Sequence, residues 1–288
     1  MSRGLLAWVD GRLVPVEQAS VSVYDRGFRS GEGVFETLRA YGEHVFRLGA
    51  HLDRARAGAT ELGFEAGQAD QLATAVQATA SANLAALGGA DSALRLTVSA
   101  GTIDPHSPFP GTPGGPPTVV VTSHALRPTP PSATAVTVPL ARELPHVKAV
   151  SYLVAVTARR RAREQGADEA LLTGADGRIL EGASSNVFLV RDGSLITPPL
   201  TGVLAGVTRS VVVTVAGRLG IPLAQRDVAA AELLGADEAL LTATTREIVP
   251  LVAVDGRPIG AGVPGAVTRR LQAGYRDEVA RELTGRSR

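Results

Sequence analysis

The chain has 288 residues, with 29 basic residues against 28 acidic ones and no cysteine. At about 100–200 residues per domain, this length fits one large or two modest domains. The balanced charge and scattered arginines argue against a nucleic-acid partner, and the absence of cysteine excludes disulfides, thiolate metal sites and cysteine nucleophiles. No apolar run reaches the roughly 18–20 residues of a membrane-spanning helix, and the first apolar stretch is too short for a secretory signal. We therefore expect a cytoplasmic protein with no membrane partner.

The N-terminal half predicts strands around two helices. Hydrophobic alternation and turn residues indicate a hairpin over 5–16 with its turn at Asp10-Gly11, a strand over 19–25, and a second hairpin from 34–41 and 44–48. Helical spacing follows over 51–63 and 68–87, and then strands over 93–100 and 117–123. The Pro/Gly-rich stretch between these strands, within 101–117, predicts a long exposed loop.

The C-terminal half alternates strands and helices. Strands are predicted over 133–139, 168–173, 178–182, 185–191, 194–197, 237–243 and 247–254, and helices over 151–166, 206–220 and 264–284. The sequence GADEALLT occurs twice, at 166–173 and 235–242, and both copies predict strands that leave helix ends. We expect a mixed α/β (α+β) fold with a small N-terminal domain (1–123), a linker (124–132) and a larger C-terminal domain (133–288).

Lysine usage singles out one residue. Of the 29 basic residues, 28 are arginine and one, Lys148, is lysine. Arginine replaces lysine at most solvated positions, but its guanidinium does not lose its proton in proteins. A lysine amine, once desolvated, can act as a nucleophile and form a Schiff base. Codon bias explains the arginines, and Lys148 is therefore a candidate for amine chemistry.

Common catalytic motifs are absent from the sequence. There is no Gly-x-Gly-x-x-Gly, Walker loop, His-Glu-x-x-His or Gly-x-Ser-x-Gly. The five histidines, at 44, 51, 106, 124 and 146, lack metal-ligand spacing, and we expect no metal. A Ser-His-Asp hydrolase that uses Ser184 or Ser185 stays open, without a motif to support it.

Four features together suit a cofactor that carries an aldehyde and a phosphate. Lys148 is expected at a strand end just before a helix, where its amine could reach a cleft. Gly206-Val207-Thr208 opens a predicted helix, whose free N–H groups and dipole attract phosphate. Arg54, on an early helix, can add a bidentate phosphate contact. Glu181 ends a strand, where a carboxylate could hold a pyridine nitrogen protonated.

Longer passages in the same order resemble a known family. They are DRGFRSGEGVFETLRAY (25–41), FRLGAHLDRA (46–55), VKAVSYL (147–153), GADEALLTGADGRILEGASSNVFLVRDGSLITPPL (166–200), GVLAGVTR (202–209) and LLTATTREIVPLVAVDGRPIG (240–260). The chain resembles the class IV pyridoxal-phosphate enzymes of fold type IV, which include branched-chain aminotransferases, D-amino acid aminotransferases and 4-amino-4-deoxychorismate lyases. The resemblance covers nearly the whole chain and implies two domains with pyridoxal 5'-phosphate in the cleft between them.

The resemblance also assigns roles to individual residues. It implies that Lys148 forms the Schiff base and shuttles protons, and that Glu181 pairs with the pyridine nitrogen. Candidate cofactor contacts are Arg54, Tyr152, Ser185, Asn186, Val207, Thr208 and Thr244. Candidate substrate contacts are Thr245, Phe35, Arg39 and Arg95, with Thr37 as a further catalytic candidate. Members of the family are dimers that share residues between subunits, so the resemblance implies a homodimer.

The subfamily signals conflict. Phe35-Glu36-Thr37 and Ser151-Tyr152-Leu153 resemble the lyases, in which a threonine hydroxyl could assist elimination, whereas Ala243-Thr244-Thr245 resembles the aminotransferase turn. The leading hypothesis is an aminodeoxychorismate lyase that releases 4-aminobenzoate and pyruvate for folate synthesis. The alternatives are an aminotransferase acting on branched-chain or D-amino acids with 2-oxoglutarate, and a non-catalytic paralogue that binds a phosphorylated ligand.

Overall fold

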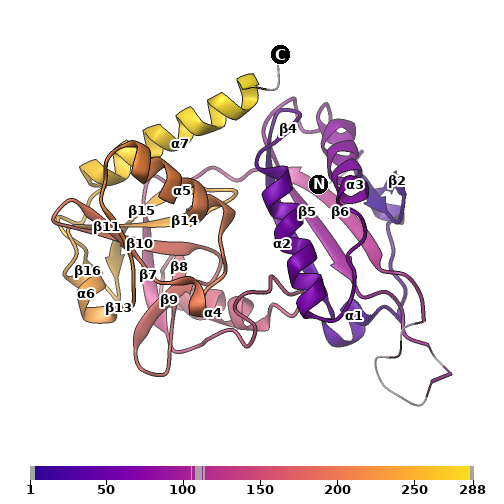
Figure 1. Ribbon diagram of the computed structural model, residues 1–288, viewed down its shortest axis with the longest axis horizontal. Coiled ribbons are helices and arrows are strands. Elements are labelled where there is room, and N and C mark those ends of the chain that lie inside the picture. Colours follow the sequence, from indigo (N-terminus) through magenta and orange to yellow (C-terminus); the bar gives the residue numbers. More distant parts are fainter. Residues whose placement is uncertain (1–3, 105, 108–111, 113, 286–288) are drawn as a thin grey trace. The chain divides into compact units, whose positions relative to one another are not determined.

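Two compact units make up the chain (Figure 1). The computed structural model describes residues 4–104, 106–107, 112 and 114–285. Unit 1 comprises residues up to Arg127 together with Val147–Ser151, and unit 2 comprises Pro128–His146 and the chain from Tyr152 onward. The segment that carries Lys148 therefore packs with the N-terminal unit, although its neighbours on both sides in the sequence belong to unit 2.

Unit 1, over its described residues, is an antiparallel sheet with two long helices. Its elements are β1 (Leu6–Val9), β2 (Arg12–Pro15), the 3-10 turn η1 (Val16–Gln18), α1 (Arg26–Ser30), β3 (Gly33–Tyr41), β4 (His44–Val45), α2 (Leu48–Glu61), α3 (Ala69–Asn83), β5 (Ser92–Ser99) and β6 (Thr118–Ala125). These strands lie in the order β2-β1-β6-β5-β3-β4. Every neighbouring pair runs antiparallel.

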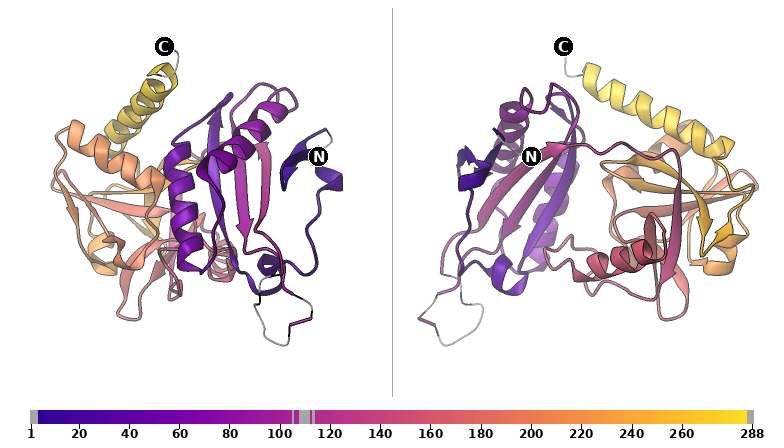
Figure 2. Two further views of the ribbon diagram at one scale, coloured as in Figure 1. Left: turned by 45° about the vertical axis from the view of Figure 1, so that its right-hand side comes forward. Right: turned by 180° about the vertical axis from the view of Figure 1, so that it is seen from behind.

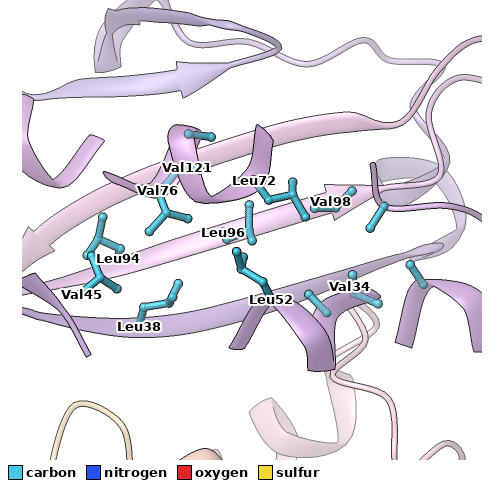
Figure 3. Close-up of a cluster of buried hydrophobic side chains, with 14 of the residues drawn as sticks. Val34, Leu38, Val45, Leu52, Leu72, Val76, Leu94, Leu96, Val98 and Val121 are labelled. Carbon is cyan, nitrogen blue, oxygen red and sulfur yellow. The ribbon is translucent and has the colours of Figure 1, made fainter. Parts of the chain in front are cut away.

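The core of unit 1 lies between this sheet and the helices α2 and α3. Along β3, Val34 and Leu38 point into the buried cluster, together with Leu52 from α2 and Leu72 from α3 (Figure 3). Since side chains alternate between the two faces of a strand, residue 36 shares the helix-covered face with residues 34 and 38. The odd-numbered residues of β3 are thereby placed on the opposite face, without the two helices.

One predicted strand does not form, because residues 19–24, all of them described, belong to no strand. Val21 and Val23 are exposed, so the Ser/Val alternation has no buried face to stabilise it. Asp25 instead ends the segment by accepting hydrogen bonds from the backbone of Gly27 and Phe28, which caps the short helix α1. The strand prediction for 19–25 is wrong for this reason.

Unit 2, over its described residues, combines a ten-stranded sheet with four helices (Figure 2). Its elements are β7 (Ala133–Val138), α4 (Leu153–Glu164), β8 (Glu169–Thr173), β9 (Arg178–Gly182), β10 (Asn186–Arg191), β11 (Ser194–Thr197), η2 (Leu200–Gly202), α5 (Val207–Arg218), β12 (Leu223–Gln225), β13 (Val228–Ala229), α6 (Ala230–Leu234), β14 (Glu238–Ala243), β15 (Glu247–Val254), β16 (Arg257–Pro258) and α7 (Ala266–Gly285). The strand order is β12-β11-β10-β14-β15-β7-β8-β9-β13, with β16 on β15. Strand β7 runs parallel to both β8 and β15.

The sheet of unit 2 has a packed core on each face. One core contains Ala135, Val187 and Leu241, and the other packs Ala155 and Ala158 of α4 against β7 and β8. Alanines on α4 let the helix approach the strands closely. The two GADEALLT copies become β8 and β14 as predicted, and the mixed α/β class is confirmed.

Two further findings concern the predictions for loops and membrane segments. The predicted loop over 101–117 lies partly outside the described residues. In its described part, Gly114 donates a backbone hydrogen bond to Thr102, and Asp104 donates one to Thr112. Within the part of the chain that the structure describes, every helix is too short or too polar to cross a bilayer.

Candidate active site

Lys148 lies on a short extended segment that continues the sheet of unit 1 beside β3. The backbone N–H of Phe35 donates to the carbonyl of Lys148 at 2.8 Å, and Val150 donates to Gly33 at the same distance. Val34 and Ala149 form an antiparallel bridge between these bonds. The sequence prediction of a strand end before a helix is therefore corrected, because β7 ends at Val138 and Lys148 lies in the connection to α4.

This pairing brings Lys148 together with several predicted substrate contacts. Its Nζ lies 4.7 Å from the centroid of the Phe35 ring, and the guanidinium carbon of Arg95 lies 3.8 Å from the same centroid. Thr37 is the cross-strand partner of Arg95 and shares the face of Phe35. Four predicted site residues thus lie together on the sheet face of unit 1 opposite α2 and α3: Phe35, Thr37, Arg95 and Lys148.

Arg39 has a different environment from the other predicted substrate contacts. Its guanidinium forms an ion pair with Asp91 at 2.9 Å and lies over the ring of Tyr41, with 4.4 Å between the guanidinium carbon and the ring centroid. These contacts hold Arg39 four residues further along β3 than Phe35. Its proposed role at the substrate remains a prediction.

Arg54 belongs to a buried charge network on the helix side of β3. Its Nε and Nη2 donate to the two carboxylate oxygens of Glu36 at 2.7 and 2.6 Å. The Nδ1 atom of His51 lies 2.8 Å from Glu36 Oε2. A carboxylate can only accept, so His51 Nδ1 carries the proton of this bond. Glu36 therefore holds the predicted phosphate arginine in one orientation from the face opposite Phe35.

The protonation states in this network follow from burial and charge. Burial by itself raises the pKa of Glu36, but Arg54 and His51 outweigh this effect and lower the pKa to about 2. Burial lowers the pKa of His51 below its usual value. The carboxylate of Glu36 opposes this effect, but the charges of Arg54 and Lys148 act with burial and the pKa stays lowered. Glu36 is thus an anion and His51 a neutral imidazole near pH 7.

In unit 2, Glu181 lies near the end of β9 as predicted and is almost fully buried. Its carboxylate accepts from Arg142 Nε at 2.7 Å, from the backbone N–H of Leu204 at 3.1 Å and from Asn186 Nδ2 at 3.4 Å. Arg142 also donates to the carbonyl of Ala183 at 2.9 Å. Burial opposes the charge on Arg142, but Glu181 outweighs burial and raises the pKa of Arg142. These hydrogen bonds hold the carboxylate in one orientation.

Asn186 connects Glu181 to the predicted phosphate site. Its amide nitrogen also donates to the carbonyl of Leu204 at 2.9 Å. Gly206, the N-cap of α5, provides no side chain to satisfy the first N–H groups of that helix, which include those of Val207 and Thr208. The structure therefore brings the predicted pyridine partner and the predicted phosphate cup into one connected group.

Gly206 leaves no space for a side chain beside Asn186. A Cβ at this position would lie 1.9 Å from Asn186 Oδ1, whereas a Cβ on Gly217, in the same helix, would meet open space. We expect Gly206→Ala to displace Asn186 or the start of α5 and to lower phosphate and cofactor affinity at least tenfold, with about 1–3 kcal/mol of stability lost. Gly217→Ala is the matched control and should raise stability by about 0.5–1 kcal/mol. Cofactor titration by fluorescence and urea unfolding measure both effects, and equal affinities for the two variants would contradict the assignment.

The remaining predicted cofactor contacts lie in the same unit. The hydroxyl of Tyr152 donates to the carbonyl of Ala183 at 3.2 Å, and the Arg142 guanidinium carbon lies 5.5 Å from the centroid of its ring. Thr244 and Thr245 occupy the centre of a turn that the bond from Arg246 N to Ala243 O closes at 3.2 Å. Ser185 donates to Glu169 instead, at 3.1 Å, so its hydroxyl is engaged within the protein.

The residues present suit pyridoxal phosphate on three counts. The N-terminus of α5 offers uncapped N–H groups, Glu181 offers an anion, and Lys148 offers an amine. In addition, the buried hydroxyl of Thr242 has no hydrogen-bond partner among the described residues, and Thr242 pairs across β14 and β10 with Asn186. Because cross-strand partners share a sheet face, this hydroxyl lies on the side of Asn186. An unsatisfied buried polar group of this kind fits a site that a ligand completes.

Sequence reasoning missed Glu36, His51 and Arg142 as parts of the site. The spacing of His51 and Arg54, three residues apart on a predicted helix, is a usable signal because such residues share a helix face. Glu36 alternates with Phe35 and Thr37 and shares a strand face with Val34 and Leu38. A charged residue on that buried face requires a partner of opposite charge, and this is a second usable signal. Arg142 lies in an irregular segment and carried no pattern.

A cavity described in unit 1 lies elsewhere. It has a volume of about 700 Å³ and is bordered by the β1–β2 hairpin, the start of α3 and the residues that precede β6. None of the predicted site residues lines it. The polar and charged groups described above, rather than this cavity, therefore define the candidate site.

Comparisons with known proteins identify the family of the chain. Residues 33–254 match the family model for amino-transferase class IV. The D-alanine aminotransferase of Bacillus licheniformis is 30% identical over 279 residues, covering 95% of this chain and 96% of that protein. The branched-chain aminotransferase of Thermoproteus uzoniensis, solved with norvaline, is 34% identical with a TM-score of 0.85, covering 94% of this chain and 93% of that one.

A further solved structure bears on the cofactor. A branched-chain amino acid aminotransferase from the organism abbreviated T.th., solved with pyridoxamine 5'-phosphate, is 29% identical with a TM-score of 0.86 and covers 96% of this chain and 94% of that one. The named relatives are enzymes, which removes the non-catalytic alternative. The chain belongs to the class IV aminotransferases, the pyridoxal-phosphate-dependent enzymes of fold type IV.

Proposed function

We propose that this enzyme transfers the amino group of a branched-chain amino acid to a 2-oxo acid, with pyridoxal phosphate as its cofactor. The observation that carries the proposal is the position of Lys148, the one lysine of the chain, against the Phe35 ring with Arg95 stacked beside it. An amine that forms and breaks covalent bonds is thereby set beside an apolar ring and a guanidinium. An apolar side chain and a carboxylate are the two features that branched-chain substrates present.

The residues of the chain divide the work as follows. Val207, Thr208, Thr244 and Arg54 would hold the phosphate, and Glu181 would hold the pyridine nitrogen. Pyridoxal phosphate supplies an aldehyde for covalent attachment and a ring that accepts electrons from the substrate α-carbon. Lys148 would attach the cofactor and, once displaced by substrate, take the α-proton on Nζ and return it on the cofactor side. Arg142 forms an ion pair with Glu181 and would orient its carboxylate toward the pyridine nitrogen.

The similar proteins act on two substrate classes, branched-chain amino acids and D-amino acids. D-amino acids are the second candidate, because a D-alanine aminotransferase is among the similar proteins. The lyase activity expected from Phe35-Glu36-Thr37 stays a prediction, supported by the position of Thr37 on the face of Lys148 and Phe35. The relatives named above are all aminotransferases, so we place the lyase activity third.

A donor panel separates these activities. Purified holoenzyme is assayed with L-leucine, L-valine, L-isoleucine and D-alanine against 2-oxoglutarate, and separately with 4-amino-4-deoxychorismate. Glutamate formed from the L-donors and absent with Lys148→Ala supports the proposal. Glutamate from D-alanine alone identifies a D-amino acid aminotransferase. Release of 4-aminobenzoate without glutamate would overturn the proposal in favour of the lyase.

We also propose that the enzyme works as a homodimer. Val21, Val23 and Phe28 expose large apolar side chains within one short segment of unit 1. Such a run in contact with water is typical of a surface that another chain covers. Sedimentation at micromolar concentration tests this, and a monomer with full activity would contradict it. A cytoplasmic location stays a prediction of the sequence.

A further inference from the structure

The first copy of the repeated GADEALLT sequence places a buried carboxylate next to the candidate site. Glu169, the first residue of β8, is 1% exposed. One of its oxygens, Oε2, accepts from Ser184 Oγ at 3.1 Å, Ser185 Oγ at 3.1 Å and Arg246 Nη2 at 2.6 Å. Its other oxygen accepts from its neighbour Ala170 N at 3.2 Å. Glu169 thus joins two segments that are far apart in the sequence.

The two segments are those that carry predicted cofactor and substrate contacts. Ser184 and Ser185 directly precede Asn186, which binds Glu181 and lies against the start of α5. Arg246 closes the turn whose central residues are Thr244 and Thr245. Glu169 therefore accepts hydrogen bonds from Ser185, the neighbour of Asn186, and from Arg246, the neighbour of Thr245.

The turn ends in a residue with a left-handed backbone conformation. The residue after Arg246, Glu247, has φ +57°, a left-handed conformation that costs energy for any residue except glycine. Such a conformation persists only where surrounding contacts hold it. The backbone pairing of Ala243 with Glu247 supports this conformation, and Arg246 adds side-chain contacts, because its guanidinium binds Glu169 at 2.6 Å and lies 3.4 Å from Ser184 Oγ.

The second copy of the motif uses its glutamate differently. Glu238 accepts from the backbone N–H groups of Val267 and Thr268 at 2.9 and 2.8 Å, which caps the start of α7. Its hydrogen bonds within the described chain include neither the Thr244–Thr245 turn nor the Ser184–Ser185 segment. The glutamate of the first copy therefore contacts the Thr244–Thr245 turn through Arg246, whereas the glutamate of the second copy caps helix α7.

We propose that Glu169 and Arg246 are positioning residues for substrate binding: their ion pair sets the Thr244–Thr245 turn in the orientation that receives the substrate carboxylate. This inference rests on the proposed function and on the substrate contact that the family resemblance implies for Thr245. Neither residue exchanges a proton or forms a bond in the reaction. Their effect reaches the substrate through the backbone of the turn.

The test measures binding of a carboxylate that cannot react. Wild-type holoenzyme, Glu169→Gln, Arg246→Met, Arg246→Lys and Glu238→Gln are titrated with 4-methylpentanoate, which has no amino group, and binding is followed by the cofactor absorbance. Urea unfolding of each variant is recorded in parallel. Misplacement of a binding group by about 1 Å can cost roughly 100-fold, so we expect Kd to rise about 10- to 100-fold in Glu169→Gln and Arg246→Met.

Three further results are expected if the ion pair positions the turn. Arg246→Lys binds 4-methylpentanoate more tightly than Arg246→Met, because lysine keeps the positive charge but lacks the planar guanidinium. The double variant Glu169→Gln/Arg246→Met is no weaker than the worse single variant, since both remove one interaction. Glu238→Gln loses stability without a change in Kd. The phosphorus NMR signal of bound cofactor shifts only in the Glu169 and Arg246 variants.

Two outcomes would overturn the inference. One is an unchanged Kd in Arg246→Met. This variant decides the test by itself if Glu169→Gln does not fold. The other is an equal rise of Kd in Glu238→Gln, which would make the effect one of general stability. Failure of the proposed function has a different signature, because wild-type enzyme would then form no glutamate from L-leucine, L-valine or L-isoleucine, while carboxylate binding still distinguishes the variants.

Discussion

Replacement of Lys148 by alanine is expected to lower kcat by at least about 1,000-fold. The amine serves both as the attachment point of the cofactor and as the base that moves a proton at the substrate α-carbon, and proton transfer alone contributes about 100- to 10,000-fold. No second lysine exists elsewhere in the chain to replace it. Single-turnover measurement of the amino-donor half-reaction with L-leucine gives the rate directly.

Lys148→Arg is the matched control for charge. It keeps a cation near the Phe35 ring, which lies 4.7 Å from the wild-type Nζ, but arginine does not give up its proton. We expect this variant to be as inactive as Lys148→Ala while unfolding at nearly the wild-type denaturant concentration. Activity of Lys148→Arg within tenfold of wild type would show that Lys148 acts only through its charge.

Replacement of Glu36 by glutamine is expected to cost about 3–5 kcal/mol of stability, the usual effect of breaking a buried ion pair by removing one partner. The carboxylate is fully buried, and both Arg54 and His51 donate to it, so glutamine leaves Arg54 without a counter-charge. The loss of orientation at Arg54 should also weaken the affinity for pyridoxal phosphate about tenfold or more. Urea unfolding and cofactor titration measure the two effects separately.

The buried carboxylate of Glu36 also predicts how stability depends on pH. Burial raises the pKa of Glu36, but Arg54 and His51 lower it from 4.5 to about 2, a difference worth about 3 kcal/mol at about 1.4 kcal/mol per pKa unit. The stabilisation is therefore complete above pH 4.5 and is lost as the pH falls toward 2. The stability difference between wild type and Glu36→Gln should shrink across this interval. Glu61→Gln, at the exposed end of α2, is the control and should show no such trend.

Local sequence patterns predicted the elements that hold the site. Glu181 at the end of β9, Gly206 at the start of α5 and Arg54 on α2 lie where strand and helix signals put them. Each of these positions depends on a few neighbouring residues, on alternation in a strand or on a helix start. Patterns of that range are readable from one sequence.

Pairwise contacts over long separations could not be predicted. Arg142 and Glu181 are 39 residues apart, and Glu169 and Arg246 are 77 apart, so only the folded sheet brings them together. The segment of Lys148 was misplaced for the same reason, because it pairs with the edge of β3 rather than with its neighbours in sequence. The 19–25 strand failed because alternation alone does not provide a partner strand.

The measurement that tests the central claim most directly is the site of covalent cofactor attachment. Holoenzyme is reduced with borohydride, digested and analysed by mass spectrometry, with Lys148→Arg treated in parallel. The account predicts the phosphopyridoxyl group on Lys148 in the wild type and no such peptide in the variant. A wild-type enzyme that transaminates with unmodified Lys148 would contradict the account.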